Sequence, residues 1–110
     1  ALLIGDKTMV SSARFDAAQI VVDGTVGRVE VENQVTYFTI KVQKAAKGWA
    51  GNRVLAATGT GNGDCGLRSE IETIANSGRS FRFFGFVPNP HSPFRVWLTS
   101  CAPPIEMEDG

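Results

Sequence analysis

One stretch of this 110-residue chain decides its fold: QIVVDGTVGRVEVE, residues 19–32. Apolar side chains alternate along it as in a strand with one buried face, but the phase of the alternation slips. The apolar positions are first even and then odd: Ile20, Val22 and Val26, followed by Val29 and Val31. A slip of one residue exchanges the two faces of a strand, and glycines at 24 and 27 surround it. The stretch therefore predicts one long strand with a β-bulge or sharp bend near its middle.

Working outward, the same kind of pattern predicts four more strands: residues 35–44, 53–58, 79–87 and 94–100. A hairpin turn at residues 32–34 separates the first two strands. The last two are separated by residues 88–93, which hold three prolines and cannot lie in a sheet interior. Between the third and fourth strands, apolar residues from Leu67 to Ala75 recur at helical spacing and predict a short amphipathic helix.

Three strands, a helix and two strands is the element order of the OB fold. The sequence thus predicts an all-β fold with a short helix, namely a five-stranded Greek-key barrel of the OB type. A chain of this length holds one modest core, so residues 1–110 are expected to form a single domain. Residues 1–12 are expected to be an irregular lead-in and residues 102–110 an irregular tail. Residues 11–18 form either a short helical turn or part of that lead-in.

The composition limits the classes of function that the chain can have. The chain is 43% hydrophobic and 20% charged, and its 11 basic residues balance its 11 acidic ones. Zero net charge argues against phosphate binding as the main activity, because such proteins need a basic excess to release counterions. No apolar run is long enough to span a membrane. The first residue is Ala1, which leaves open whether the start is processed or trimmed.

Five short segments carry motifs that belong together. They are an apolar run ending in Gly-x-Val (16–26), a strand ending in Lys-Gly (37–48), a Cys-Gly-apolar step (65–67), an aromatic strand (83–86) and a strand ending in Cys (97–101). In this order and spacing, they resemble the netrin-like domains, which include the tissue inhibitors of metalloproteinases (TIMPs). The resemblance covers about residues 16–104. It implies an OB-type barrel that acts through protein contacts.

The N-terminus departs from that family. Its protease inhibitors begin with Cys-x-Cys, and the amine of the first cysteine chelates the protease zinc. This chain has neither cysteine, so the resemblance does not support the inhibitory mechanism. It does identify the residues that match the loop at the inhibitors' binding edge, which are candidate contact residues: Asn62, Gly63, Asp64, Cys65 and Gly66.

The resemblance also implies that Cys65 and Cys101 lie near one another. With the N-terminal partners absent, they are candidates for a disulfide, which would stabilise the fold by about 3–4 kcal/mol in the chain-entropy model. The alternative is a pair of buried, reduced thiols that act as small apolar residues. The sequence leaves both open.

Two further residues are of types that could form a site. Trp49 lies in a turn, where it is either a contact anchor or a plug folded back over the barrel mouth. His91 lies in the proline-rich loop, and one histidine with two distant cysteines has no zinc-site spacing. We therefore expect no metal, no cofactor and no catalytic residue.

The aromatic stretch RSFRFFGF, residues 79–86, places a basic residue and three phenylalanines at the spacing of an RNA-binding RNP1 segment. Two positions depart from that pattern, Ser80 and Arg82. We favour a core strand, in which Phe81 and Phe83 pack inward while Phe84 and Phe86 cover the opposite side.

The first functional hypothesis is a non-enzymatic binding module that contacts a protein partner at the barrel rim. It is expected to be exported to the periplasm, cell surface or extracellular space, with the cytoplasm left open. The alternative is an OB-fold protein that binds single-stranded nucleic acid on a stacking platform of Phe81, Tyr37, Trp97 and nearby arginines.

Overall fold

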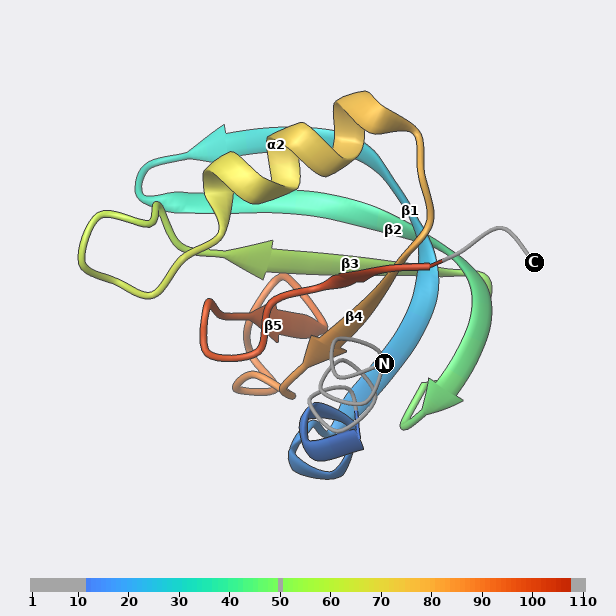
Figure 1. Cartoon of the computed structure of the whole chain (residues 1–110). Helices are drawn as coiled ribbons and strands as arrows, with labels where there is room; N and C mark the ends of the chain where they lie inside the picture. Colours follow the sequence, from blue (N-terminus) through green and yellow to red (C-terminus); the bar gives the residue numbers. More distant parts are fainter. Residues whose placement is uncertain (1–11, 50, 108–110) are drawn as a thin grey trace.

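Six strands form one mixed sheet in the computed structural model, which describes residues 12–49 and 51–107 (Figure 1). The strands are β1 (Ile20–Glu32), β2 (Val35–Lys47), β3 (Arg53–Thr58), β4 (Phe81–Gly85), β5 (Val96–Leu98) and β6 (Ile105–Glu106). Helix α2 (Arg68–Ser77) lies between β3 and β4, and residues 12–17 form a second helix. The expectation of a mostly β fold with a helix between the third and fourth strands is confirmed.

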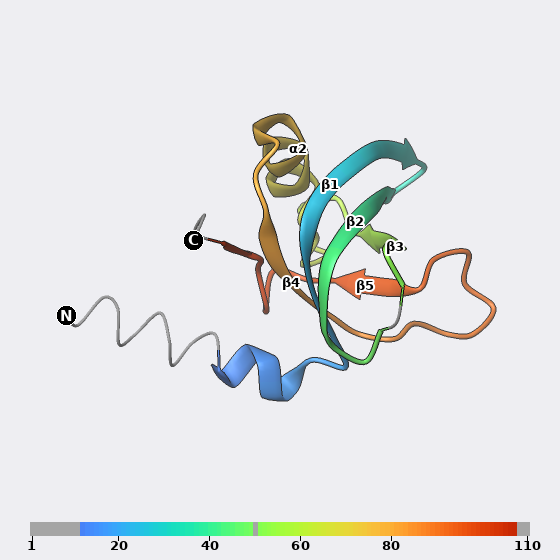
Figure 2. The same cartoon turned by 90° about the vertical axis from the view of Figure 1, so that its right-hand side faces the viewer.

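The sheet order is β5-β3-β2-β1-β4-β6. Neighbouring strands are antiparallel, except that β3 and β5 are parallel. Figure 2 shows β1 and β2 curving together over their whole length, with α2 against one side of the curve. Within the described residues, no helix is long and apolar enough to cross a membrane.

The irregularity predicted in the first strand is present. The β1–β2 register shifts at three places, between Val21 and Val22, between Asp23 and Gly24, and between residues 26 and 29. A Cβ at residue 24 would collide with the backbone carbonyl of Lys41, so only glycine allows this close approach of the two strands. The bend lets the first half of β1 pair with both β2 and β4, while the second half pairs with β2 alone.

Two buried clusters cover the two faces of the sheet around β1. The main core holds Ile20, Val22, Val26, Phe38, Ile40, Val54, Ala56, Leu67, Ile71, Ile74, Phe83, Val96 and Leu98. The second cluster, on the opposite face, holds Ala18, Val21, Phe84 and Ala102. Full burial of each large apolar side chain stabilises the fold by about 1.5–3 kcal/mol. Phe83 packs in the main core and Phe84 in the second cluster on the opposite face, as the core-strand interpretation predicted.

The C-terminal segment differs from the irregular tail that the sequence predicted. Ile105 pairs with Arg82 and Glu106 with Phe81, so β6 extends the sheet beyond β4. The pairing has a physical cause, because Ile105 also packs against the second cluster. At the other end, residues 12–17 form a helix, which is the helical alternative for residues 11–18, so the irregular lead-in does not include residue 12. Phe15 of this helix packs on the same cluster. Residues 1–11 and 108–110 lie outside the described residues.

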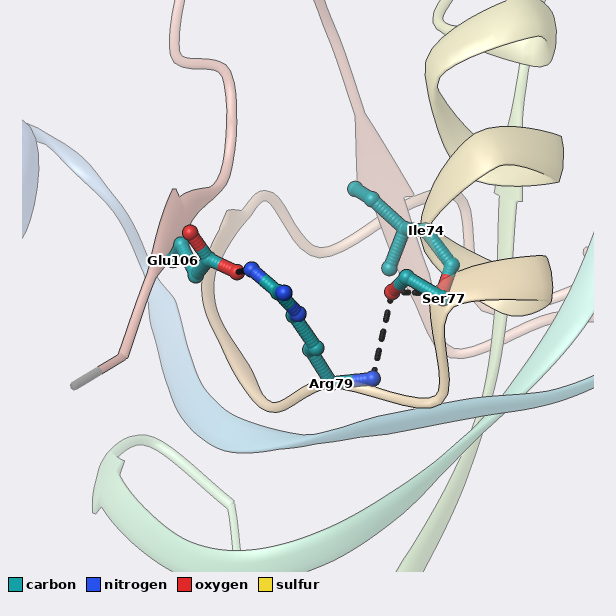
Figure 3. Close-up of polar contacts among 4 residues, drawn as sticks. All are labelled: Ile74, Ser77, Arg79 and Glu106. Atoms are coloured by element: carbon teal, nitrogen blue, oxygen red, sulfur yellow. Dashed lines mark hydrogen bonds and ion pairs between the residues drawn. The ribbon is translucent and has the colours of Figure 1, made fainter. Parts of the chain in front are cut away.

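The end of α2 is fixed to β6 (Figure 3). Gly78 caps the helix in the left-handed conformation, at φ 68°, as expected for a glycine stop signal. The Ser77 hydroxyl donates to the Ile74 carbonyl at 2.7 Å and accepts from the Arg79 amide at 3.1 Å. The Arg79 guanidinium then pairs with Glu106 at 2.8 Å. This chain of contacts joins the helix end to the last strand.

Candidate functional site

The loop between β3 and α2, residues 59–66, is here called the rim loop. It folds around the carboxylate of Asp64. Oδ2 accepts hydrogen bonds from the Thr60 amide at 2.8 Å and the Thr60 hydroxyl at 2.9 Å. Oδ1 accepts from the amides of Gly61 at 2.8 Å and Gly66 at 3.0 Å. These donors, led by the backbone amides of Thr60 and Gly61, lower the pKa of Asp64 from 3.8 to about 2.

The rim loop is tied to the fold at both ends. At its start, the Thr58 hydroxyl donates to the Leu98 carbonyl at 2.9 Å and accepts from the Leu67 amide at 2.8 Å. At its end, the Cys65 carbonyl accepts from the Ser100 amide at 2.8 Å. Residues 61–65 between these ties are exposed. The loop therefore offers a solvent-facing surface with a fixed shape.

A hollow of about 490 Å³ lies beside the rim loop. Its lining residues are Gln34, Thr60, Asn62, Gly63, Asp64 and Arg68. The structure thus brings together three of the predicted contact residues, with Cys65 and Gly66 next in the chain. It adds Gln34 from the β1–β2 turn, Thr60, and Arg68 from the start of α2, which sequence reasoning missed. No local motif joins Gln34 to the loop, because its contact depends on the hairpin's position.

Arg68 holds an unusual position in this hollow. Its Nε donates to the Thr36 hydroxyl at 2.6 Å. Its Nη2 is buried and has no hydrogen-bond partner among the described residues. The Arg68 side chain therefore contributes positive charge to the hollow. The carboxylate of Asp64, which also lines the hollow, already accepts four hydrogen bonds from its own loop.

Trp49 does not join the rim loop. It precedes β3, whereas the loop follows it, so the six residues of β3 separate them by about 20 Å. Trp49 is half-buried and packs against the main core, and its indole Nε1 is buried without a partner among the described residues. Of the two alternatives that the sequence left open, this placement favours the plug over the exposed anchor.

Cys65 and Cys101 are both exposed and carry free thiols. The alternative of two buried thiols is therefore wrong, because the chain holds both residues at the surface, one at the rim-loop end and one after β5. The hydrogen bond from Ser100 to the Cys65 carbonyl places the two segments in direct backbone contact. The disulfide itself stays a prediction.

His91 lies exposed in the β4–β5 loop, and its backbone amide donates to Asn89 Oδ1 at 2.9 Å. Within the described residues, no group of three or more histidine, cysteine or carboxylate side chains is placed to hold a metal ion.

The stacking platform expected for nucleic acid is rearranged. Phe81 packs against the main core, whereas Tyr37 and Trp97 alternate with core residues and lie on the other face of the sheet, so Phe81 is not beside them. Those two rings are instead linked by Phe94, whose centroid lies 6.0 Å from that of Tyr37 and 5.6 Å from that of Trp97. Sequence reasoning missed Phe94 because it adjoins the proline-rich loop and lies far along the chain from Tyr37.

We compared the chain with models of protein families and with curated proteins, and neither comparison found a match.

Proposed function

We propose that this chain is a non-enzymatic binding module, built on a five-stranded OB-type barrel, that contacts a protein partner through the rim loop. The observation that carries the proposal is the pinning of an exposed loop by a single carboxylate, Asp64, through four hydrogen bonds. A loop held in its binding shape loses little conformational entropy when a partner docks, so its contacts are retained as affinity.

Strand connectivity supports the barrel. The five longer strands follow the order β5-β3-β2-β1-β4, with β3 and β5 parallel. The two outer strands of this set approach each other at an isolated bridge between Phe86 and Trp97, where the two backbones exchange hydrogen bonds of 3.0 and 2.8 Å. A bridge at this place would close the five strands into the OB arrangement, with α2 between the third and fourth.

The resemblance to netrin-like domains supports a protein as the partner. The matching residues from Asn62 to Gly66 lie on the rim loop, and the hollow beside it is lined mainly by polar side chains. Amide, hydroxyl and guanidinium groups at a fixed loop suit the polar rim of a protein interface.

Export is part of the same proposal. The segments that carry Cys65 and Cys101 are in backbone contact, and both thiols are exposed. In an oxidising compartment, a disulfide there would join the rim loop to the segment after β5. It would close a loop of about 35 residues and would further reduce the freedom of the rim loop.

A site-specific crosslinking experiment tests the proposal. A photoreactive amino acid replaces Asn62 in the rim loop or, as a control, the exposed Glu72 on α2. The 110-residue chain is irradiated in an extract of its source organism. We expect one protein to crosslink from position 62 and not from position 72. The purified partner should then bind the Asp64→Ala variant at least about tenfold more weakly than the original chain. Equal crosslinking from both positions, or unchanged affinity of Asp64→Ala, would contradict the proposal.

A further inference from the structure

The outward face of β2, β3 and β5 carries a surface that the rim-loop proposal does not use. The inward residues of these strands lie in the main core: Phe38, Ile40, Val54, Ala56, Val96 and Leu98. Because side chains alternate along a strand, the residues between them point outward. The strand register then fixes which of these outward residues are neighbours.

The register arranges the outward residues in three rows. In the first row, Tyr37 pairs with Ala57 and Ala57 with Trp97. In the second row, Thr39 pairs with Leu55, and the Leu55 carbonyl accepts a hydrogen bond from the Arg95 amide at 2.8 Å. In the third row, Lys41 pairs with Arg53. The face thus changes from aromatic to cationic over four residues of β2, from Tyr37 to Lys41.

The first row forms a continuous aromatic surface. The Phe94 ring contacts both Tyr37 and Trp97, with interplanar angles of 60° and 38°. Between them Ala57 has no exposed surface, although it points away from the core. Tyr37 and Trp97 are its register neighbours on either side. All three rings are themselves only half-buried, so part of each ring remains open to solvent.

The other rows supply positive charge without a counter-charge. Lys41, Arg53 and Arg95 are exposed, and none has a carboxylate partner within the described residues. No outward position of the three rows is acidic. On the neighbouring strand β1, Glu30 pairs with Tyr37 in the register, and its carboxylate is bound by Arg28 at 2.7 Å. A ligand on this face would therefore meet aromatic rings on one side and unpaired cations on the other.

We propose that this face binds single-stranded nucleic acid. We call it the aromatic–cationic face and define it as Tyr37, Leu55, Phe94, Trp97, Lys41, Arg53 and Arg95. A single strand presents unpaired bases, which stack on aromatic side chains, beside a phosphate backbone that attracts lysine and arginine. A duplex hides the flat faces of its bases, so it matches only the cationic rows. An acidic peptide likewise offers charge without a row of planar groups.

The charge of the whole chain sets the expected affinity. Since formal net charge is zero, long-range attraction is weak and binding must come from the face itself. We expect dissociation constants between about 1 and 100 μM at low salt. If the three cations each neutralise one phosphate, the slope of log K against log salt concentration is about −2 for a single strand.

Fluorescence anisotropy of labelled probes with the 110-residue chain tests this inference. The probes are an oligothymidylate and an oligouridylate of about 12 nucleotides, a duplex of the same length, and a poly-glutamate peptide. We expect both single strands to bind, at least about tenfold more tightly than the duplex. The Arg53→Gln/Arg95→Gln double variant, which changes only exposed side chains, should weaken single-strand binding at least about tenfold and flatten the salt slope.

Two controls separate this face from general charge. Lys44→Gln removes an exposed lysine on another part of β2, whose register neighbour on β1 is Asp23, and it should leave binding unchanged. Phe94→Ala should weaken single-strand binding while leaving the weaker duplex binding in place. Absence of single-strand binding at about 100 μM protein and low salt would overturn the proposal. So would poly-glutamate binding as tight as that of oligothymidylate, or a loss in Lys44→Gln equal to that of the arginine variant.

Discussion

Asp23 and Arg82, direct neighbours across β1 and β4, form a two-point ion pair in which Nε donates to Oδ1 at 2.7 Å and Nη2 to Oδ2 at 2.9 Å. The pair is largely shielded from solvent, with 8% of the Asp23 side chain and 22% of the Arg82 side chain exposed. The hydrogen bond to Asp23 raises the pKa of Arg82 above its usual value. The pair therefore joins the bent first strand to β4 one position before the end of their shared register.

The first prediction concerns this pair. Asp23→Ala leaves the Arg82 charge partly buried and without its carboxylate, so the free energy of unfolding should fall by about 3 kcal/mol. Urea denaturation measures the change. The matched control is Glu30→Ala, which removes the ion pair between Glu30 and Arg28. This pair is exposed, with 57% of the Glu30 side chain and 82% of the Arg28 side chain open to solvent. That change should be below about 1 kcal/mol. Equal effects of the two variants would mean that the Asp23–Arg82 pair adds no more than a surface pair.

The second prediction concerns the pH dependence of the rim loop. The pKa of Asp64 is lowered to about 2 in the fold, whereas its ordinary value is 3.8. The carboxylate therefore favours the folded loop at pH values above 3.8, and this contribution disappears as the pH falls through 2. In amide NMR spectra, Gly61 and Gly66, which donate to Asp64, should shift together with a midpoint near pH 2.

The Asp64→Asn variant is the control for that titration. It cannot ionise, and its amide nitrogen no longer accepts hydrogen bonds, so the shared transition of Gly61 and Gly66 should vanish. A midpoint near 3.8 in the original chain would show that the four hydrogen bonds do not persist in solution.

Local patterns in the sequence predicted the strands well. The alternation in residues 35–44 and the phase slip in residues 19–32 both reflect which side of one strand is buried, and the structure bears out both. The same holds for Phe83 and Phe84, whose opposite faces follow from alternation alone. These features depend on neighbours a few residues apart, which is why the sequence displays them.

The contacts that sequence reasoning missed join distant segments. Arg82 lies 59 residues from Asp23, and the Arg68 contact to Thr36 spans 32 residues. The contact between the Tyr37 and Phe94 rings joins β2 to the residues before β5. It forms only when β3 lies between β2 and β5 in the sheet. β6 was missed for a related reason, since two residues are too few to display alternation and their pairing depends on β4. Such features depend on register, and no local pattern contains them.

The third prediction concerns the cysteines. Treatment of the native chain with oxidised glutathione should join Cys65 to Cys101 within one molecule, because their segments are in backbone contact and both thiols are exposed. Intact mass after alkylation, without and then with reductant, detects the bond. Oxidation should stabilise the chain by about 3–4 kcal/mol if the bond forms without strain.

The Cys101→Ser variant is the control, and it should gain only a mixed disulfide with glutathione. Dimers as the main product of the original chain would contradict the predicted pairing, since they would show that each thiol meets another molecule more readily than its neighbour.

The fourth prediction tests Trp49 as a plug. Its ring packs on the main core, but its buried Nε1 has no partner within the described residues. Trp49→Phe keeps much of the apolar contact and removes the unpaired donor, so the free energy of unfolding should change by less than about 1 kcal/mol. Trp49→Ala removes the ring and should cost about 3 kcal/mol. Urea titration followed by circular dichroism compares both with the original chain. If Trp49→Ala is as stable as Trp49→Phe, the ring contributes little to the core, and the exposed-anchor alternative regains support.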